Sequence, residues 1–300
     1  PARILNLCHL RYLARSATYV LPAAVSQLRN IHTLVIHGPW NCRASGSSQT
    51  LLLEYWSMPS LRHLQCSVTI YLKNPPGANS ELPQLFVSKN LQTLSTIKIS
   101  CCTKEVFSVM PHLKKLEICE TEEDCGICEP SVLLGNLQYL KELETLECCF
   151  YKQRVEARQI SFFSALPCSL RQLSLSWSYL PWEDTSLIGM LRRLEVLKLK
   201  HFAFHGPKWE PKTKGFCRLT HLLIENTDLV HWEATVHHFP RLQYLVLKSC
   251  KLLEEIPFDV EEIGTLQRIE LHHCNRTTEI LAREIQEQVE GIEVVIRSER

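Results

Sequence analysis

The residues whose spacing best suits chemistry are Cys125 and Cys128, a CxxC pair with Cys119 nearby. Such a pair can serve as a thiol redox couple or as half of a zinc site. Zinc takes about four ligands at workable spacing, and no second CxxC or HxxxH follows the pair within reach. The 13 histidines are scattered along the chain. We therefore expect an ordinary loop at this CxxC and no metal site.

Known catalytic signatures are missing from the sequence. It contains no GxxxxGK[ST] loop, no GxGxxG, no HExxH and no GxSxG, and it has only 10 glycines. We expect no enzymatic activity and no cofactor in this chain. The formal net charge of +1 argues against nucleic acid as a partner, and no apolar run is long enough for a membrane span.

A leucine frame of the form LxxLxL supplies the elements of the chain. In its clearest copy, Leu242, Leu245 and Leu247 are followed by Cys250, and Cys274 takes the matching place one copy later. The first frame position recurs at Leu10, Ile31, Leu61, Leu91, Leu113, Leu143, Leu170, Leu194, Leu219, Leu242 and Leu266. This pattern is typical of leucine-rich repeats. It predicts an α/β right-handed solenoid, or horseshoe, of about eleven repeats, with a parallel concave sheet and an irregular or short-helical convex side.

The repeats predict one leucine-rich-repeat domain over residues 1–300. Residues 1–277 hold the repeats, and 278–300 form a polar C-terminal cap, with a helix at 278–290 and a strand at 292–296. Arg15 stands at the third leucine position of the first repeat. A charged side chain there must reach solvent or find a partner.

Small residues able to donate a hydrogen bond follow the third frame position by three places. They are Thr18, Thr69, Thr121, Ser178, Thr227, Cys250 and Cys274. We expect this ladder to bond the backbone carbonyls that the bend leaves unpaired. It gives a structural role to two of the 14 cysteines. Because several other cysteines stand where a small apolar residue is wanted, we expect a reduced, intracellular compartment.

The candidate binding surface comes from the residues between the frame leucines, which alternate to the solvent side of the strands. These are Ala14, Val35, Gln65, Ser95, Glu117, Glu147, Ser174, Lys198, Leu223, Val246 and Glu270. Aromatic and basic residues, which interfaces favour, gather beside them in the sixth to eighth repeats. The predicted protein-binding residues are Glu117, Glu147, Phe150, Tyr151, Trp177, Tyr179, Lys198, Lys200, His201, Glu225 and Lys248. Trp182 and Trp209, beside prolines and glutamates in lateral segments, are expected to be packing residues.

Several phrases resemble one protein family along nearly the whole chain. They include residues 9–14 (HLRYLA), 90–96 (NLQTLST), 222–230 (LLIENTDLV) and 251–257 (KLLEEIP). They are similar to the leucine-rich-repeat region of plant nucleotide-binding immune receptors of the coiled-coil type, the late blight resistance homologues of the nightshade family.

The resemblance implies a longer receptor, with coiled-coil and nucleotide-binding domains upstream of this chain. ATP or ADP would bind in that upstream part, and the repeats would hold it closed until a pathogen effector, or a guarded host protein, is perceived. Defence signalling and hypersensitive cell death would follow. The resemblance implies a cytoplasmic protein, with the nucleus and the membrane periphery as other places of residence.

Three alternatives stay open at the level of sequence. A repeat arm of an F-box ubiquitin ligase adaptor would be indicated by an upstream F-box. A secreted inhibitor of a pathogen enzyme would be indicated by mapped disulfides or a glycan at Asn275. An enzyme built on Cys125 and Cys128 would lose its function when both are replaced by serine.

Overall fold

The structure is a computed structural model. It describes residues 7, 9–16, 28–37, 58–67, 69–72, 88–124, 130–150, 162–213, 215–235, 237–257 and 264–297, and the backbone path alone at 51–53. Contacts divide the chain into two units. Unit 1 is Pro1–Tyr151 with Ser164–Ser169, and unit 2 is Lys152–Phe163 with Leu170–Arg300.

Each leucine frame forms a strand that begins two residues after the first frame position. In unit 1 these strands are β1 (Tyr12–Ser16), β2 (Thr33–His37), β4 (His63–Cys66), β6 (Thr93–Lys98), β7 (Lys115–Cys119) and β8 (Thr145–Cys149). Successive strands pair in parallel, and frame leucines pair with frame leucines, as Leu13 does with Leu34 and Leu34 with Leu64. The predicted leucine-rich-repeat fold is therefore confirmed within this unit.

A tight turn before each strand sets its register. The N–H of Leu61 donates to the carbonyl of Met58, three residues earlier, at 3.1 Å. The next two N–H groups, of Arg62 and His63, both donate to His32 of the preceding coil, at 2.8 and 3.0 Å. Leu61 and the inward Leu64 are buried, and each buried leucine contributes roughly 1.5–3 kcal/mol to folding. These hydrogen bonds fix the register between a coil and the coil before it.

Strand β6 departs from the frame. Its pairing with β7 shifts between Leu94 and Ile97, so Ser95 and Thr96 form a bulge. Thr96 has a left-handed backbone, with φ of 47°, and Ile97 takes the inward place that the frame gives to Thr96. Ser95 is buried, and its hydroxyl donates to the carbonyl of Leu64 at 3.3 Å. The prediction that Ser95 faces solvent was wrong, because a bulge turns its side chain away from the strand's alternation.

Unit 1 carries short elements on its return side. Two short strands, β3 (Leu51–Leu53) and β5 (Ile70–Leu72), pair with each other, and β5 also pairs with β6. The helices are α1 (Lys104–Ser108) and α2 (Pro130–Leu134), with 3-10 turns η5 (Ile99–Cys101), η6 (Glu122–Asp124) and η7 (Gly135–Tyr139). A further 3-10 turn, η8, covers Phe163–Ala165. The buried Lys98 forms an ion pair with Glu123.

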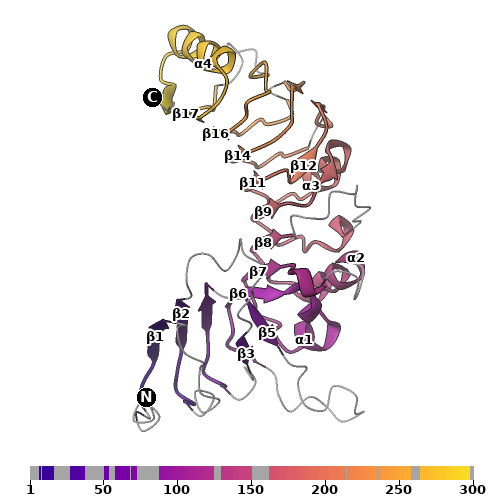
Figure 1. The fold of residues 1–300 in the computed structure, drawn as a ribbon, viewed down its shortest axis with the longest axis vertical. Coiled ribbons are helices and arrows are strands. Elements are labelled where there is room, and N and C mark those ends of the chain that lie inside the picture. The colour runs from indigo at the N-terminus through magenta and orange to yellow at the C-terminus, as the bar shows by residue number, and fades with distance from the viewer. Residues whose placement is uncertain are drawn as a thin grey trace. The chain divides into compact units, whose positions relative to one another are not determined.

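Unit 2 repeats the plan with greater regularity. Its strands are β9 (Gln172–Ser176), β11 (Val196–Lys200), β14 (His221–Glu225), β16 (Tyr244–Lys248), β17 (Arg268–His272) and β18 (Glu293–Arg297). All pair in parallel in sequence order, with unbroken register (Figure 1). The return side holds 3-10 turn η9 (Trp182–Asp184), helix α3 (Thr185–Gly189) and two pairs of two-residue strands, β10 (Leu180–Pro181) with β12 (Phe204–His205) and β13 (Lys208–Trp209) with β15 (His231–Trp232).

Three tryptophans stack on the return side of unit 2. The ring centroids of Trp182 and Trp209 lie 4.8 Å apart, and those of Trp209 and Trp232 lie 5.1 Å apart. The indole N–H of Trp182 donates to the Gly206 carbonyl and that of Trp209 to the Thr185 hydroxyl. All three rings are buried. Trp182 and Trp209 are therefore packing residues, as the sequence predicted.

The chain's last helix, α4 (Arg276–Gln288), leads into β18 and covers the final coil (Figure 1). It begins two residues before the predicted start because Asn275 caps it, and the Asn275 side chain accepts the N–H of Thr278 at 2.7 Å. Thr278, Ala282 and Ile285 are the buried residues of the helix. Strand β18 follows within one residue of its predicted span.

The predicted ladder of small donors forms in part in unit 2. The hydroxyl of Ser178 donates to the Ala203 carbonyl of the next coil at 2.7 Å. The thiols of Cys250 and Cys274 donate to carbonyls of the preceding coil, whereas the Thr227 hydroxyl accepts the N–H of Leu229. Thr18, another predicted member, lies outside the described residues. Side-chain donors thus close the bend between strand and return.

Candidate functional site

The residue that follows each of β9, β11, β14, β16 and β17 adopts a left-handed bend. The φ angle is 59° at Trp177, 49° at His201, 53° at Asn226, 52° at Ser249 and 52° at His273. Asparagine tolerates this conformation best among non-glycine residues, whereas bulky side chains hold it at a cost of roughly 1 kcal/mol or more. Strain of this kind gathers at functional sites, so the two rings at Trp177 and His201 mark the bends to inspect.

Hydrogen bonds between coils fix these bends. The N–H of His201 donates to the Glu225 carbonyl at 2.7 Å, and the N–H of Asn226 donates to Lys248 at 2.8 Å. The N–H of Trp177 donates to the His201 carbonyl at 3.0 Å. Each bend is therefore imposed by the stacking of the repeats, whatever side chain it carries.

Four aromatic side chains at the ends of β9 and β11 form what we call the aromatic cluster: Trp177, Tyr179, His201 and Phe202. The Trp177 ring stacks on His201, with centroids 5.2 Å apart and planes 15° apart. Tyr179 stacks on Phe202, at 5.8 Å and 4°. Trp177 also lies 6.3 Å from Tyr179 and 6.2 Å from Phe202. All four rings are half-buried, so their outer faces are presented to solvent.

Two members of the cluster are strained in the same way as the bend residues. Tyr179 has φ of 49° and Phe202 has φ of 54°. The N–H of Tyr179 donates to the Phe202 carbonyl, and the N–H of Phe202 donates to Asn226. Burial, and then the nearby carboxylate of Asp228, raise the pKa of the Tyr179 hydroxyl. Tyr179 is therefore neutral at physiological pH and can donate or accept a hydrogen bond.

Charged side chains flank the cluster on the open side of the sheet. Lys200 of β11 is in register with Glu225 of β14, which is in register with Lys248 of β16. Parallel strands lie about 4.8 Å apart, so Glu225 stands between two lysines. Lys198 lies two residues before Lys200 on the same strand. The local balance is positive, beside exposed aromatic faces.

The structure brings part of the predicted site together. Trp177, Tyr179 and His201 are in direct ring contact, and Lys198, Lys200, Glu225 and Lys248 lie on β11, β14 and β16 of the same sheet. Glu117 and Glu147 belong to unit 1, where they are in register on β7 and β8. The Glu117 carboxylate lies 3.1 Å from Lys115 and accepts the Thr96 hydroxyl at 3.2 Å.

Two predicted residues do not join the site. Phe150 is buried, with 3% of its surface exposed, and was wrongly predicted as a binding residue. It directly follows β8, where its apolar ring turns into the core. Tyr151 lies outside the described residues, as do Cys125 and Cys128. Ser174 was also wrongly placed on the open surface: it is 2% exposed, because its short side chain lies in register beside the longer Lys198.

Phe202 belongs to the aromatic cluster although the predicted binding set leaves it out. It lies two residues after β11, whereas the buried Phe150 directly follows β8. The left-handed backbone at Phe202 turns its side chain onto Tyr179, and that conformation leaves no mark in the sequence.

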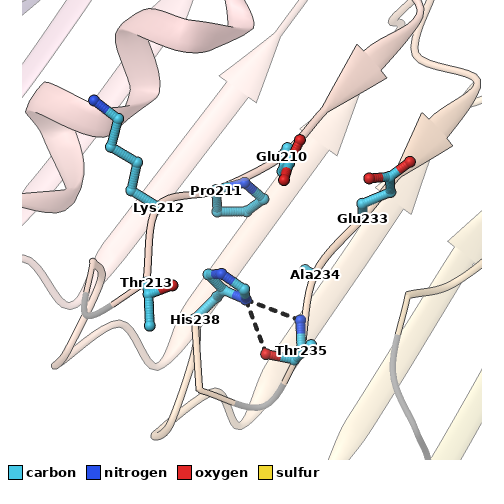
Figure 2. Close-up of a pocket in the computed structure, with 8 residues that line it drawn as sticks. All are labelled: Glu210, Pro211, Lys212, Thr213, Glu233, Ala234, Thr235 and His238. Carbon is cyan, nitrogen blue, oxygen red and sulfur yellow. Dashed lines mark hydrogen bonds between the residues drawn. The ribbon is translucent and has the colours of Figure 1, made fainter.

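An open pocket of about 700 Å³ lies on the return side of unit 2 (Figure 2). It is lined by Glu210, Pro211, Lys212, Thr213, Glu233, Ala234, Thr235 and His238. Nδ1 of His238 lies 3.0 Å from the Thr235 hydroxyl, but it already accepts the backbone N–H of Thr235 at 2.9 Å. A neutral imidazole has one acceptor nitrogen, so His238 does not serve as a base toward that hydroxyl. The pocket carries no catalytic arrangement among its lining residues.

Neither a metal site nor a membrane span is found in the part of the chain that the structure describes. There, no group of three or more His, Cys, Asp or Glu residues could hold a metal ion. None of the described helices has both the length and the apolar character that crossing a bilayer requires.

The chain is similar to a set of plant proteins. Three late blight resistance protein homologs of Solanum demissum are each 32% identical to it, over 296, 293 and 298 residues, covering 94%, 95% and 95% of this chain. The chain spans 35%, 21% and 22% of their lengths. No protein-family model matches. Among solved structures, a chain in the mouse RP105/MD-1 complex is similar at 15% identity, with a TM-score of 0.49, covering 96% of this chain and 55% of that one.

Proposed function

Since this chain is a relative of the late blight resistance protein homologs along nearly its whole length, we propose that it is the recognition and autoinhibition module of an intracellular plant immune receptor. It has no catalytic activity of its own. It perceives a pathogen effector directly or through a host protein, and it restrains a nucleotide-binding domain elsewhere in the receptor. Perception releases that restraint and leads to defence signalling and cell death.

The observation that supports recognition most directly is the aromatic cluster. Large apolar rings in contact with solvent are favoured at protein interfaces, because they bury much area at low cost in side-chain entropy. Trp177 also holds a strained bend that Asn, as at Asn226, would occupy more easily. A surface that keeps bulky rings at such positions favours a partner that covers them.

The charges beside the cluster support a partner with complementary groups. Lys198, Lys200 and Lys248 surround the single carboxylate of Glu225 on neighbouring strands. A partner segment with carboxylates next to an apolar side chain fits this arrangement. Electrostatic complementarity mainly steers association and selects the partner.

We place the module in the cytoplasm, with the nucleus and the membrane periphery as further places of action. The ten described cysteines are thiols, which agrees with a reducing compartment. Four of them, Cys66, Cys101, Cys102 and Cys148, are fully buried or nearly so, and burial raises their pKa. They act as small core residues.

The experiment is charge reversal in the full-length receptor, expressed transiently in leaves. Lys198→Glu with Lys200→Glu should change resting cell death or the response to challenge with the late blight pathogen. The matched control is Lys251→Glu, because Lys251 is an exposed lysine of the same unit on the return side. Protein accumulation should match the parent in every case. If the double variant kept both readouts at parental levels, this surface would not be the recognition surface.

A further inference from the structure

Two cysteines, Cys250 and Cys274, occupy the same place in successive repeats of unit 2. Lys248 and His272 are in register at the ends of β16 and β17, and each cysteine lies two residues beyond its strand. The N–H of Ser249 donates to the His272 carbonyl at 2.8 Å, which carries the coil-to-coil pairing past the strands. Neighbouring parallel strands lie about 4.8 Å apart, within the roughly 4.4–6.8 Å between Cα atoms that a disulfide requires.

The sulfur of Cys274 lies against the coil that holds Cys250. It donates to the Leu247 carbonyl of that coil at 3.4 Å and to the His272 carbonyl of its own coil at 3.6 Å. The sulfur of Cys250 donates to the carbonyls of Ile224 and Lys248, both at 3.5 Å. Each thiol also shifts the pKa of the other. The ladder geometry thus places one thiol against the next.

We propose that Cys250 and Cys274 form a reversible disulfide when the chain meets a small-molecule disulfide such as glutathione disulfide. The Cys274 thiolate attacks one sulfur of the oxidant, whose S–S bond breaks and whose leaving thiolate takes up a proton. The Cys250 sulfur, on losing its proton to solvent, then attacks the Cys274 sulfur and displaces the second small thiol. Two protein thiols are oxidised by two electrons in all, and the oxidant is reduced to two thiols.

The surroundings assign different parts to the two sulfurs. Cys274 is half-buried, whereas Cys250 is fully buried, so the oxidant reaches Cys274 first. The neighbouring Cys250 side chain lowers the pKa of the Cys274 thiol to about 7, against the smaller opposing effects of burial and Glu279. The same contact and burial raise the pKa of Cys250, as does Glu225 more weakly. Cys274 is therefore the attacking thiol and Cys250 the resolving one.

Unit 1 offers a matched pair for comparison. Cys119 and Cys149 are in register on β7 and β8 and are both half-buried. Their sulfurs turn to carbonyls of their own coils, to Glu120 at 3.5 Å and to Phe150 at 4.0 Å. Both pairs are in register, and at Cys274 the sulfur also contacts the Leu247 carbonyl of the neighbouring coil.

The disulfide would tie the start of α4 to the preceding repeat. Cys274 directly precedes Asn275, the cap of α4. The Asn275 amide donates to the Leu253 carbonyl at 2.6 Å, and the Thr278 hydroxyl donates to the same carbonyl at 2.7 Å. Leu253 lies three residues after Cys250. A covalent link at this point reinforces the same docking and should slow local opening of α4.

The test treats the reduced chain with glutathione disulfide, blocks remaining thiols with N-ethylmaleimide and maps cysteine-containing peptides by mass spectrometry. The expected product is a peptide pair joined through Cys250 and Cys274, lacking two hydrogens and reversed by dithiothreitol. Amide hydrogen exchange over α4 should slow in the oxidised chain. The exposed thiols of Cys168 and Cys217 should appear as glutathione adducts, which shows that the oxidant was active.

Serine variants of the two cysteines should fold normally, because a serine already occupies the equivalent ladder position at Ser178. Cys250→Ser should leave a glutathione adduct on Cys274, and Cys274→Ser should leave Cys250 as a thiol. The proposal fails if Cys168 and Cys217 react while Cys250 and Cys274 are recovered as thiols. It also fails if the parent chain accumulates a stable adduct on Cys274 or joins only Cys119 to Cys149. These outcomes are independent of immune recognition.

Discussion

The indole of Trp177 lies flat against the imidazole of His201, with ring centroids 5.2 Å apart, and both residues hold left-handed bends at the ends of neighbouring strands. Ring stacking contributes about 0.5–1.5 kcal/mol beyond buried area. The left-handed backbone at Trp177 costs about as much. The stacked pair therefore contributes little net free energy to folding, and we expect its exposed faces to matter more for binding.

Trp177→Asn should separate recognition from stability. Asparagine suits this bend, as Asn226 shows one repeat beyond His201, so relief of strain offsets the lost stacking. The free energy of unfolding should change by less than about 1.5 kcal/mol, measured by urea denaturation. The full-length receptor carrying this variant should respond less to pathogen challenge.

The control for this variant is Trp182→Asn, which removes a buried tryptophan of the same unit. It should destabilise the chain by roughly 3–5 kcal/mol, as large-to-small core changes do. Equal losses of stability for Trp177→Asn and Trp182→Asn would show that Trp177 is a core residue, and the aromatic cluster would lose its proposed role.

Two leucine-to-aspartate variants test the alternation of the strands. Leu245 is fully buried, so Leu245→Asp places an unpaired carboxylate in the core and should cost more than about 4 kcal/mol. Leu223 lies on the open side in register with Lys198, so Leu223→Asp should cost less than about 1 kcal/mol. Thermal or urea unfolding distinguishes them. Similar losses for both would contradict the assigned faces.

The strand register could be predicted from the sequence because burial repeats with the leucines. Leu242 and Leu266 stand two residues before β16 and β17. Each inward leucine of a strand is buried in the core. The register cannot be predicted in this way where one of two paired strands has an extra residue. At β6 the extra residue is absorbed by the Ser95–Thr96 bulge, which depends on how β5 and β7 pair on either side and not on the local sequence.

Ser178→Val tests how much the donor ladder contributes to the free energy of unfolding. The Ser178 hydroxyl is buried and bonds the Ala203 carbonyl at 2.7 Å. Valine has no donor, so the carbonyl loses its partner at a cost of about 1–3 kcal/mol, and its larger side chain adds a cost of overpacking. Ser178→Cys keeps a weak donor and should cost less than Ser178→Val. A urea midpoint for Ser178→Val equal to that of the parent would argue against the ladder.

Asn275 has two roles that substitutions can separate. Its oxygen accepts the N–H of Thr278, and its amide donates to Leu253. Asn275→Ala removes both interactions and should cost about 1–3 kcal/mol. Asn275→Ser keeps a capping oxygen but is too short to reach Leu253. Hydrogen exchange in α4 should therefore quicken most for alanine and less for serine. Equal exchange in both variants would assign the whole effect to docking.

The candidate site was harder to predict than the fold, for a physical reason. Spacing and residue type placed Trp177, Tyr179 and His201 near one another, since they follow successive strands. Phe150 directly follows β8 and is buried, whereas Phe202 lies two residues after β11 and is half-buried, with a left-handed φ. That angle is set by hydrogen bonds to the next coil, such as Phe202 N–H to Asn226, and these depend on the assembled stack.

In unit 2, the backbone conformation of the bend after a strand does not depend on which side chain the bend carries. Tryptophan, histidine, asparagine and serine occupy equivalent bends at 177, 201, 226 and 249 with nearly the same φ. For the proposed recognition module, side chains at these points can therefore be exchanged, and binding specificity with them, without a change in the backbone of the repeats.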